Sequence, residues 1–176
     1  MEPQTNYFVG RLQQDLRNGE SGVGLMLTGV DRALDQWSDP YLRRAAYTGG
    51  VDFRHRFWAG RYEVRGFVAG TRVSGSAAAI AETQRSSVHY FQRPDDGSRY
   101  DTTRTSLAGD AEKISLGKVA GGILRFNASF TRFSPGFEIN DVGFLPRADR
   151  MSLSNWVGLQ FNTPGRFYRQ AFLNFN

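Results

Sequence analysis

Two histidines and several serines are the residues of this chain that could act in nucleophilic chemistry, because the sequence contains no cysteine. Ser86 and His89 lie three positions apart, so their side chains could touch if the segment is helical. A serine with a histidine as its base can hydrolyse acyl groups when a third group orients the histidine. No G-x-S-x-G motif accompanies this pair. A hydrolase is therefore the least favoured function, and we predict no catalytic residue.

Three carboxylates follow within one short stretch of the sequence. Glu138, Asp141 and Asp149 could supply the pair of acids that glycoside hydrolysis requires. The same stretch contains Arg147 and Arg150, and carboxylates in an arginine-rich loop more often serve as ion-pair partners. We therefore expect structural ion pairs here rather than catalytic acids.

Six polar residues of two long loops are the candidate contacts for a ligand or for one another. Their guanidinium, amide and carboxylate groups can either clamp loop 75–103 to loop 134–150 or hold a polar ligand such as a glycan. Clamping is favoured, because charged loop residues usually pair with each other. The six residues are Gln84, Arg85, Asp141, Arg147, Asp149 and Arg150.

Aromatic residues of the same loops permit a similar choice. Flat rings can stack on sugar faces, but rings that pack loops together have the same appearance in a sequence, and packing is favoured. The residues concerned are Trp37, Tyr41, Tyr90, Phe91 and Tyr100.

Other ligand classes find little support in the sequence. It contains no glycine-rich phosphate loop, EF-hand or zinc-ligand spacing, so we predict no cofactor and no metal. The net charge of +5 and the pI of 9.9 would normally suggest nucleic acid as a partner. The cations are spread along the chain and alternate with acids, so we predict no nucleic-acid partner.

The elements that must position these residues are strands, and residues 44–74 show the most regular pattern. From Ala45 to Phe53 every second residue is apolar or glycine, and the same alternation returns from Tyr62 to Gly70 after a short break at WAG. A period of two is typical of a strand with two unlike faces. Each arm keeps its pattern for about twelve residues, the length that a tilted strand needs to cross a bilayer. We therefore predict a transmembrane β-hairpin.

The rest of the chain extends this pattern to an all-β, antiparallel, up-and-down meander of eight long strands. Short turns and long links alternate between the strands, as in outer-membrane β-barrels. A serine followed by an alanine-rich run predicts a short helix in the long link that begins at residue 75. A change of parity near Glu112 predicts a β-bulge. The predicted strands span residues 6–16, 21–30, 44–57, 61–74, 104–119, 124–131, 152–161 and 166–176.

Composition agrees with a barrel in the outer membrane of a bacterium. The mean hydropathy is -0.46, and no run of about eighteen apolar residues is present, which excludes a helical membrane protein but not a barrel. The N-terminal stretch MEPQTN has neither the charged nor the apolar region of a signal peptide. We therefore expect residues 1–176 to be a single barrel segment, cut from a longer exported chain.

Three stretches of the sequence resemble a known family. They are LRRAAYTGGVDFRHRF, AETQRSSVHYFQRPD and SPGFEINDVGFLPRADR. They are similar to the membrane-barrel half of uncharacterised bacterial proteins that carry a family-9-like carbohydrate-binding module in front. The resemblance implies an outer-membrane location, a link to glycan capture or uptake, and a missing sugar-binding module and closing strands. It transfers no catalytic residue.

The favoured function is therefore an outer-membrane barrel domain of unknown activity, with the lipid bilayer as its partner and a glycan as its expected ligand. The first alternative is a soluble β-sandwich that binds carbohydrate. The second is a hydrolase embedded in a barrel. The continuity of an apolar band on one face of the strands distinguishes the first two.

Overall fold

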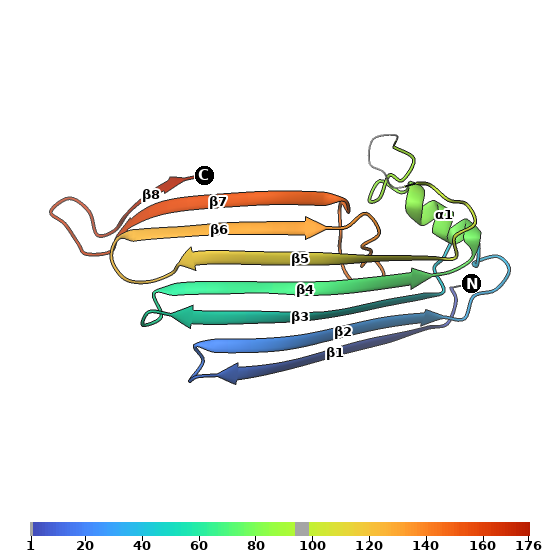
Figure 1. Ribbon diagram of the computed structural model, residues 1–176, viewed down its shortest axis with the longest axis horizontal. Helices are drawn as coiled ribbons and strands as arrows, with labels where there is room; N and C mark the ends of the chain where they lie inside the picture. The colour runs from blue at the N-terminus through green and yellow to red at the C-terminus, as the bar shows by residue number, and fades with distance from the viewer. Residues whose placement is uncertain (1, 94–98) are drawn as a thin grey trace.

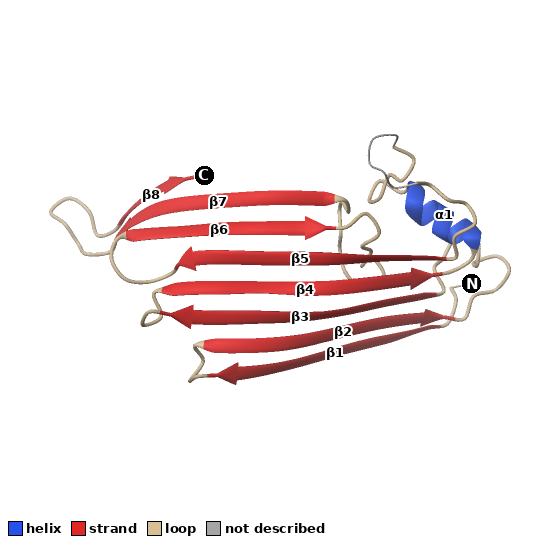
Figure 2. Ribbon diagram, in the orientation of Figure 1, coloured by secondary structure: helices blue, strands red, loops and turns tan. Residues whose placement is uncertain are grey.

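The computed structural model describes residues 2–93 and 99–176, which form one long sheet with a single helix at one end (Figures 1 and 2). The predicted turn-rich tail after the helix includes residues 94–98, which lie outside this described part. The helix is α1 (Ala77–Arg85). The strands are β1 (Thr5–Leu16), β2 (Ser21–Arg32), β3 (Ala45–Phe57), β4 (Tyr62–Ser74), β5 (Ser106–Lys118), β6 (Leu124–Phe133), β7 (Arg150–Phe161) and β8 (Ala171–Phe175).

The eight strands are antiparallel, and each pairs with the next one along the chain. This confirms the predicted up-and-down meander and its short helix. The described strands form one sheet rather than the two packed sheets of a sandwich. β1 and β8 lie at opposite edges of this sheet and do not pair with each other, so the eight strands do not close into a barrel (Figure 1).

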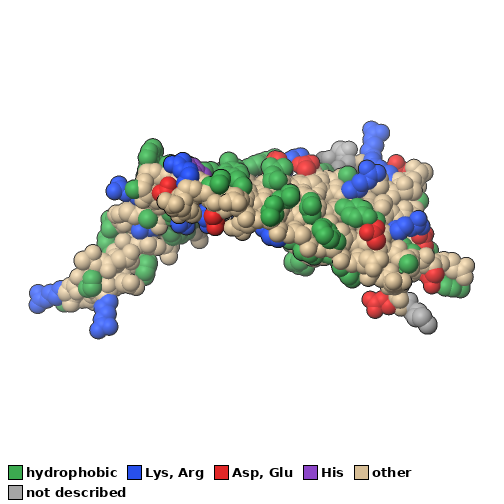
Figure 3. Space-filling model, turned by 90° about the horizontal axis from the view of Figure 1, so that it is seen from below, with side chains coloured by type: hydrophobic (Ala, Val, Ile, Leu, Met, Phe, Trp, Pro, Cys, Tyr) green, Lys and Arg blue, Asp and Glu red, His purple; other side chains and the backbone are tan. Residues whose placement is uncertain are grey.

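The two faces of the sheet have different surroundings. We call one face the covered face, because α1 and the link 134–149 pack on it at one end of the strands, the loop end. The opposite face, the bare face, carries the apolar residues of the predicted hairpin. Val51 and Val68 both lie there and are 57% exposed. Apolar side chains reach the molecular surface along much of the sheet (Figure 3).

Tight turns join the strands at the other end, the turn end. At the first turn Arg17, Asn18 and Gly19 all adopt positive φ, as the predicted Asn-Gly pair requires. Trp58 begins the second turn in the same way. The last link, 162–170, is longer than the short NTPG turn that the sequence suggested, so β8 begins later than predicted.

The predicted bulge near Glu112 is wrong. β4 and β5 pair without interruption from Tyr62 opposite Lys118 to Ser74 opposite Ser106. The parity of the apolar residues changes because the surroundings of both faces change along β5. At the loop end, Leu107 on the covered face is buried under the loops, while the bare face carries Glu112.

Two small apolar clusters fix the loops on the covered face. In the first, Ile80 of α1 and Phe91 of the turn after it pack on side chains of β2 to β5, such as Val73. In the second, Phe137 and Leu145 of the link 134–149 pack near β5. Both clusters lie at the loop end, so the turn end of the covered face has no such cover.

A glycine permits the closest approach of loop and sheet. A Cβ added to Gly109 on β5 would lie 2.1 Å from the backbone nitrogen of Phe137. We expect Gly109→Ala to push the link 134–149 off the sheet and to destabilise the fold by about 1–3 kcal/mol, as other overpacking substitutions do. Limited proteolysis within 134–149 and chemical unfolding measure both effects.

Gly70→Ala is the matched control for this prediction. Gly70 lies on the neighbouring strand and on the bare face, where an added Cβ would meet its nearest neighbour at 3.9 Å. Equal proteolysis of the Gly109→Ala and Gly70→Ala variants would contradict the tight docking of the link.

Candidate functional site

The helix α1 carries the chain into the loop end of the covered face. Ser76 caps its N-terminus, and the Ser76 hydroxyl accepts a hydrogen bond from the Ala79 N–H at 3.3 Å. The helix ends after Arg85, and the Ser86 N–H donates back to the Glu82 carbonyl at 3.0 Å. The turn that follows directs His89 toward the sheet, where its side chain is fully buried.

His89 contacts the link 134–149 through both ring nitrogens. Nδ1 lies 2.7 Å from the Pro135 carbonyl oxygen, and Nε2 lies 2.9 Å from Oε2 of Glu138. The Pro135 carbonyl oxygen can only accept, so Nδ1 donates to it, and Nε2 forms the hydrogen bond with the Glu138 carboxyl group. A buried hydrogen-bonded pair therefore joins loop 75–105 to the link 134–149.

Two arginines extend this pair into a buried charge network. Arg43, from the link between β2 and β3, donates from Nε to Asp141 at 2.8 Å and lies 3.7 Å from Glu138. Arg32, at the end of β2, donates to Asp141 at 2.7 Å. We call His89, Glu138, Asp141, Arg43 and Arg32 the mouth cluster. It joins three links of the chain to the sheet.

Neutral groups hold Glu138 in place. The Glu138 backbone N–H donates to the Thr71 hydroxyl on β4 at 3.1 Å, and the Asn140 N–H donates to the Glu138 carboxylate at 2.6 Å. The Asn140 side chain in turn exchanges hydrogen bonds with the backbone of Leu145. Each oxygen of this carboxylate thus has a donor.

These neighbours decide the charge state of Glu138. Burial raises the pKa of Glu138, but the hydrogen bonds from His89 and from the Asn140 N–H, together with the positive charge of Arg43, outweigh burial. The pKa of Glu138 consequently lies below its ordinary value. The carboxylate is therefore ionised at neutral pH.

The mouth cluster has the character of a structural clamp rather than a catalytic site. The side chains of Glu138 and Asp141 are 2% and 4% exposed, and each already has cationic partners. A glycosidase needs two carboxylates with room for a sugar between them. The structure thus agrees with the expected ion pairs.

The serine–histidine pair that was considered for acyl hydrolysis does not form. The Ser86 hydroxyl donates to the Thr83 carbonyl at 2.8 Å, while the His89 ring contacts Pro135 and Glu138. No described contact joins the Ser86 hydroxyl to the His89 ring. The barrel-embedded hydrolase therefore lacks the geometry on which it depended.

The six predicted loop residues do not form one cluster. Asp141 belongs to the mouth cluster. Asp149 pairs with Arg93 of the helical loop at 2.6 Å, so it does contact that loop. Arg147 and Arg150 are exposed, and neither forms an ion pair with the rest of the described chain.

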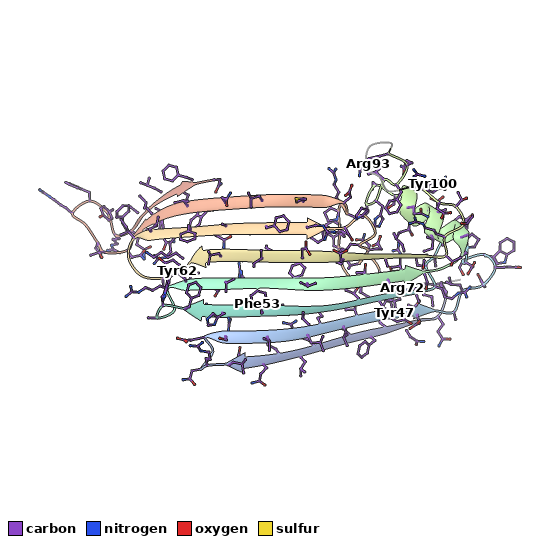
Figure 4. All side chains as sticks on the ribbon, viewed as in Figure 1. Tyr47, Phe53, Tyr62, Arg72, Arg93 and Tyr100 are labelled. Carbon is purple, nitrogen blue, oxygen red and sulfur yellow. The ribbon has the colours of Figure 1, made fainter. Side chains whose placement is uncertain are left out.

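Gln84 and Arg85 do not take part in that contact. Gln84 is buried and holds the backbone of Asp101, which donates its N–H at 3.0 Å and accepts at 2.8 Å. Arg85 pairs with Glu82 on the same helix and lies over the Tyr100 ring. Figure 4 shows Arg93 and Tyr100 beside the helix, at the loop end.

The sequence reasoning missed Arg32, Arg43 and the structural role of His89. Arg32 and Asp141 are far apart in the chain, so no local pattern could pair them. A signal did exist for His89, because it lies between Val88 and Phe91, both of which pack in the apolar clusters. A histidine among core residues is more often buried and partnered than solvated.

Some of the loop aromatics are buried and others are exposed. Phe91 is buried and Tyr100 packs beside it, which agrees with the expected loop packing. Trp37 and Tyr41 are 77% and 76% exposed on the link between β2 and β3. These two rings remain free to contact a ligand.

Cross-strand ion pairs line the covered face toward the turn end. Arg11 and Asp52 form a two-point pair between β1 and β3. Arg56 donates to Glu63 at 2.8 Å. Paired charges of both signs therefore line this face, with partners that the sequence did not specify.

Among residues 2–93 and 99–176, no three His, Cys, Asp or Glu side chains are grouped to hold a metal ion. The one helix in this part of the chain is too short to cross a membrane. No protein-family model, curated protein or solved structure matches the chain.

A comparison of a buried and a surface ion pair tests the role of the mouth cluster. We expect Glu138→Ala to destabilise the fold by about 3–5 kcal/mol, because it leaves the buried His89 ring and the nearby Arg43 without this carboxylate. Asp149→Asn breaks the more exposed pair with Arg93 and should cost less than about 1 kcal/mol. Chemical unfolding of both variants measures the difference, and equal losses would contradict the account.

Acid should release the same loops. A carboxylate whose pKa is lowered by folding stabilises the fold above its unfolded pKa of about 4.3, and that stabilisation is lost as the pH falls through the lower folded value. Proteolysis of loops 75–105 and 134–149 should therefore increase below about pH 4.3 in the wild type. In Glu138→Gln this acid dependence should be weaker. An identical pH profile for both proteins would exclude Glu138 as the cause.

Proposed function

We propose that this sheet is part of a transmembrane β-barrel of the bacterial outer membrane, closed at one mouth by the loops that the mouth cluster holds. The observation that carries the proposal is the course of the apolar band on the bare face. The band crosses the strands obliquely, as it must when tilted strands span a flat bilayer.

The loop-end limit of the band moves toward the turn end from β2 to β5 and stays level from β5 to β6. On the bare face we count from the middle of the sheet toward the loop end. The first polar residue is then Asp31 on β2, Arg72 on β4, Glu112 on β5 and Arg132 on β6. Residues that pair directly across neighbouring strands form a row, and the row that contains Asp31 on β2 contains Ser106 on β5. Measured along β5, the loop-end limit of the band therefore moves from the level of residue 106 to the level of residue 112.

This shift corresponds to a definite strand tilt. Six residues span about 20 Å along a strand, and the four steps from β2 to β6 span about 19 Å across the sheet. Their ratio gives a tilt of about 45°, close to the tilt of known transmembrane barrels. At the turn end the limit shifts in the same direction but less, from the row of Ser21, which reaches β5 at Leu116, to Lys118.

The residues between these limits suit a lipid surface. On β2 they are Val23, Leu25, Leu27 and Gly29, and on β4 they run from Tyr62 to Gly70 without a charge. Asn155 on β7 is the exception. A soluble protein would expose little of such a continuous apolar band.

An aromatic group marks the turn end of the band. The rings of Phe57, Trp58 and Tyr62 lie within 5.0 to 5.7 Å of one another, and Phe126 lies 6.2 Å from Tyr62. Aromatic side chains concentrate where a membrane meets water. Tyr47 stands near the opposite end of the sheet, next to Arg72 (Figure 4).

A barrel that contains this sheet needs further strands. Unpaired N–H and C=O groups along an edge strand are too costly in a bilayer, so only closed sheets span it. β1 and β8 each have a free edge. The proposed barrel is therefore wider than eight strands, and the closing strands come from outside these eight.

The covered face would then line the lumen. Its charged pairs toward the turn end suit a water-filled passage, and the clamped loops would narrow the opposite mouth. Polar solutes, including the glycans that the family resemblance implies, are the cargo that such a passage fits. We propose no catalytic activity.

Two neighbouring positions test which face meets lipid. The chain lacks cysteine, so single cysteines placed at Val68 and Ala69 can each carry a fluorophore on opposite faces of β4. In the closed barrel, refolded in lipid vesicles together with its closing strands, we expect a quencher attached to acyl chains to quench the label at residue 68 several-fold more strongly. Strong quenching at residue 69, or at neither position, would reject the membrane orientation.

A further inference from the structure

A cavity of about 560 Å³ lies on the covered face, between the sheet and the link 134–149. Met26 and Phe67 form its sheet side, and Phe137, Ile139 and Val142 form its loop side. Pockets of this size with mainly apolar walls are typical of small-molecule sites. The loop that closes the mouth therefore also builds one wall of a cavity.

The apolar walls of the cavity are unusual for the covered face. The rest of this face toward the turn end carries ion pairs, and a barrel lumen is usually polar. Phe133 and Phe137 pack against each other at 5.6 Å and present apolar surface to the cavity. Such a surface would face water unless an apolar molecule covered it.

The charges at the margin do not call for a charged ligand. Arg11 and Asp52 both line the cavity, and they already neutralise each other through two hydrogen bonds. An ionised ligand would have to break this pair. An uncharged ligand leaves it intact.

Two hydroxyl groups offer a polar contact. Thr28 and Thr48 lie opposite each other on β2 and β3, and Thr71 continues their row on β4. The Thr71 hydroxyl accepts from the Glu138 N–H, so it is occupied by the loop. Those of Thr28 and Thr48 form no hydrogen bond with the described part of the chain, and both residues line the cavity.

We propose that this cavity binds a small, uncharged, mainly apolar molecule that carries one hydroxyl or carbonyl group. The apolar body would lie against Phe67, Phe137 and Val142, and the polar group would meet Thr28 or Thr48. This proposal extends the proposed function, since it names a ligand class for the face that would line the lumen.

1-Naphthol is a suitable probe, with naphthalene as its counterpart without a hydroxyl group. We expect calorimetric titration of the folded full chain in amphipol to show one saturable 1-naphthol site per chain. Thr48→Val should weaken 1-naphthol about fivefold, the effect of one hydrogen bond, and leave naphthalene unchanged. Ala69→Leu fills the cavity and should weaken both probes at least tenfold.

Val64→Leu is the matched control, because residue 64 lies on the bare face of the same strand and does not line the cavity. It should leave both affinities unchanged. No saturable binding by the folded wild type, or equal affinities in wild type, Thr48→Val and Ala69→Leu, would overturn the proposal. A site that takes maltose in preference to 1-naphthol would also overturn it.

The proposed membrane orientation and the proposed ligand site can be rejected independently of each other. Loss of lipid quenching at residue 68 with intact 1-naphthol binding would reject only the membrane orientation. Normal quenching without 1-naphthol binding would reject only the cavity.

Discussion

The contact between His89 and Glu138 is the interaction on which the loop end of this structure depends. It is buried, it joins two links that are distant in the sequence, and it brings Arg43 from a third link. The Thr71 hydroxyl then ties the backbone of Glu138 to β4. Without this contact, α1 and the link 134–149 would have only two small apolar clusters to hold them on the sheet.

The loops cover only part of one face, and this explains the unusual distribution of apolar residues. At the loop end the covered face is apolar and the bare face turns polar, as Leu107 and Glu112 on β5 illustrate. Toward the turn end the relation is reversed, with ion pairs on the covered face and apolar side chains on the bare one. A soluble single sheet has no partner for that bare band, whereas a bilayer would bury it.

Much of the fold could be predicted from sequence because strand alternation is a local signal. β1 to β4 keep an apolar bare face over their middle parts, and their limits were predicted to within a few residues. On β5 a bulge was wrongly predicted, because the apolar residues change from one face to the other when both faces change surroundings along the strand.

The candidate site could be predicted less well, because its contacts are not local in the sequence. Its contacts join residues that are 49 positions apart in the case of His89 with Glu138 and 109 apart in the case of Arg32 with Asp141, and only the folded topology brings them together. The two long loops were identified as neighbours. The residues that join them, His89 with Glu138 and Arg93 with Asp149, differ from the predicted pairing through Gln84 and Arg85.

Polarised infrared spectroscopy of the protein in oriented lipid bilayers tests the central claim most directly. If the apolar band follows a flat membrane, the amide I dichroism should give strands tilted by about 45° from the bilayer normal. Strands that lie in the plane of the membrane, or a sheet without preferred orientation, would contradict the account.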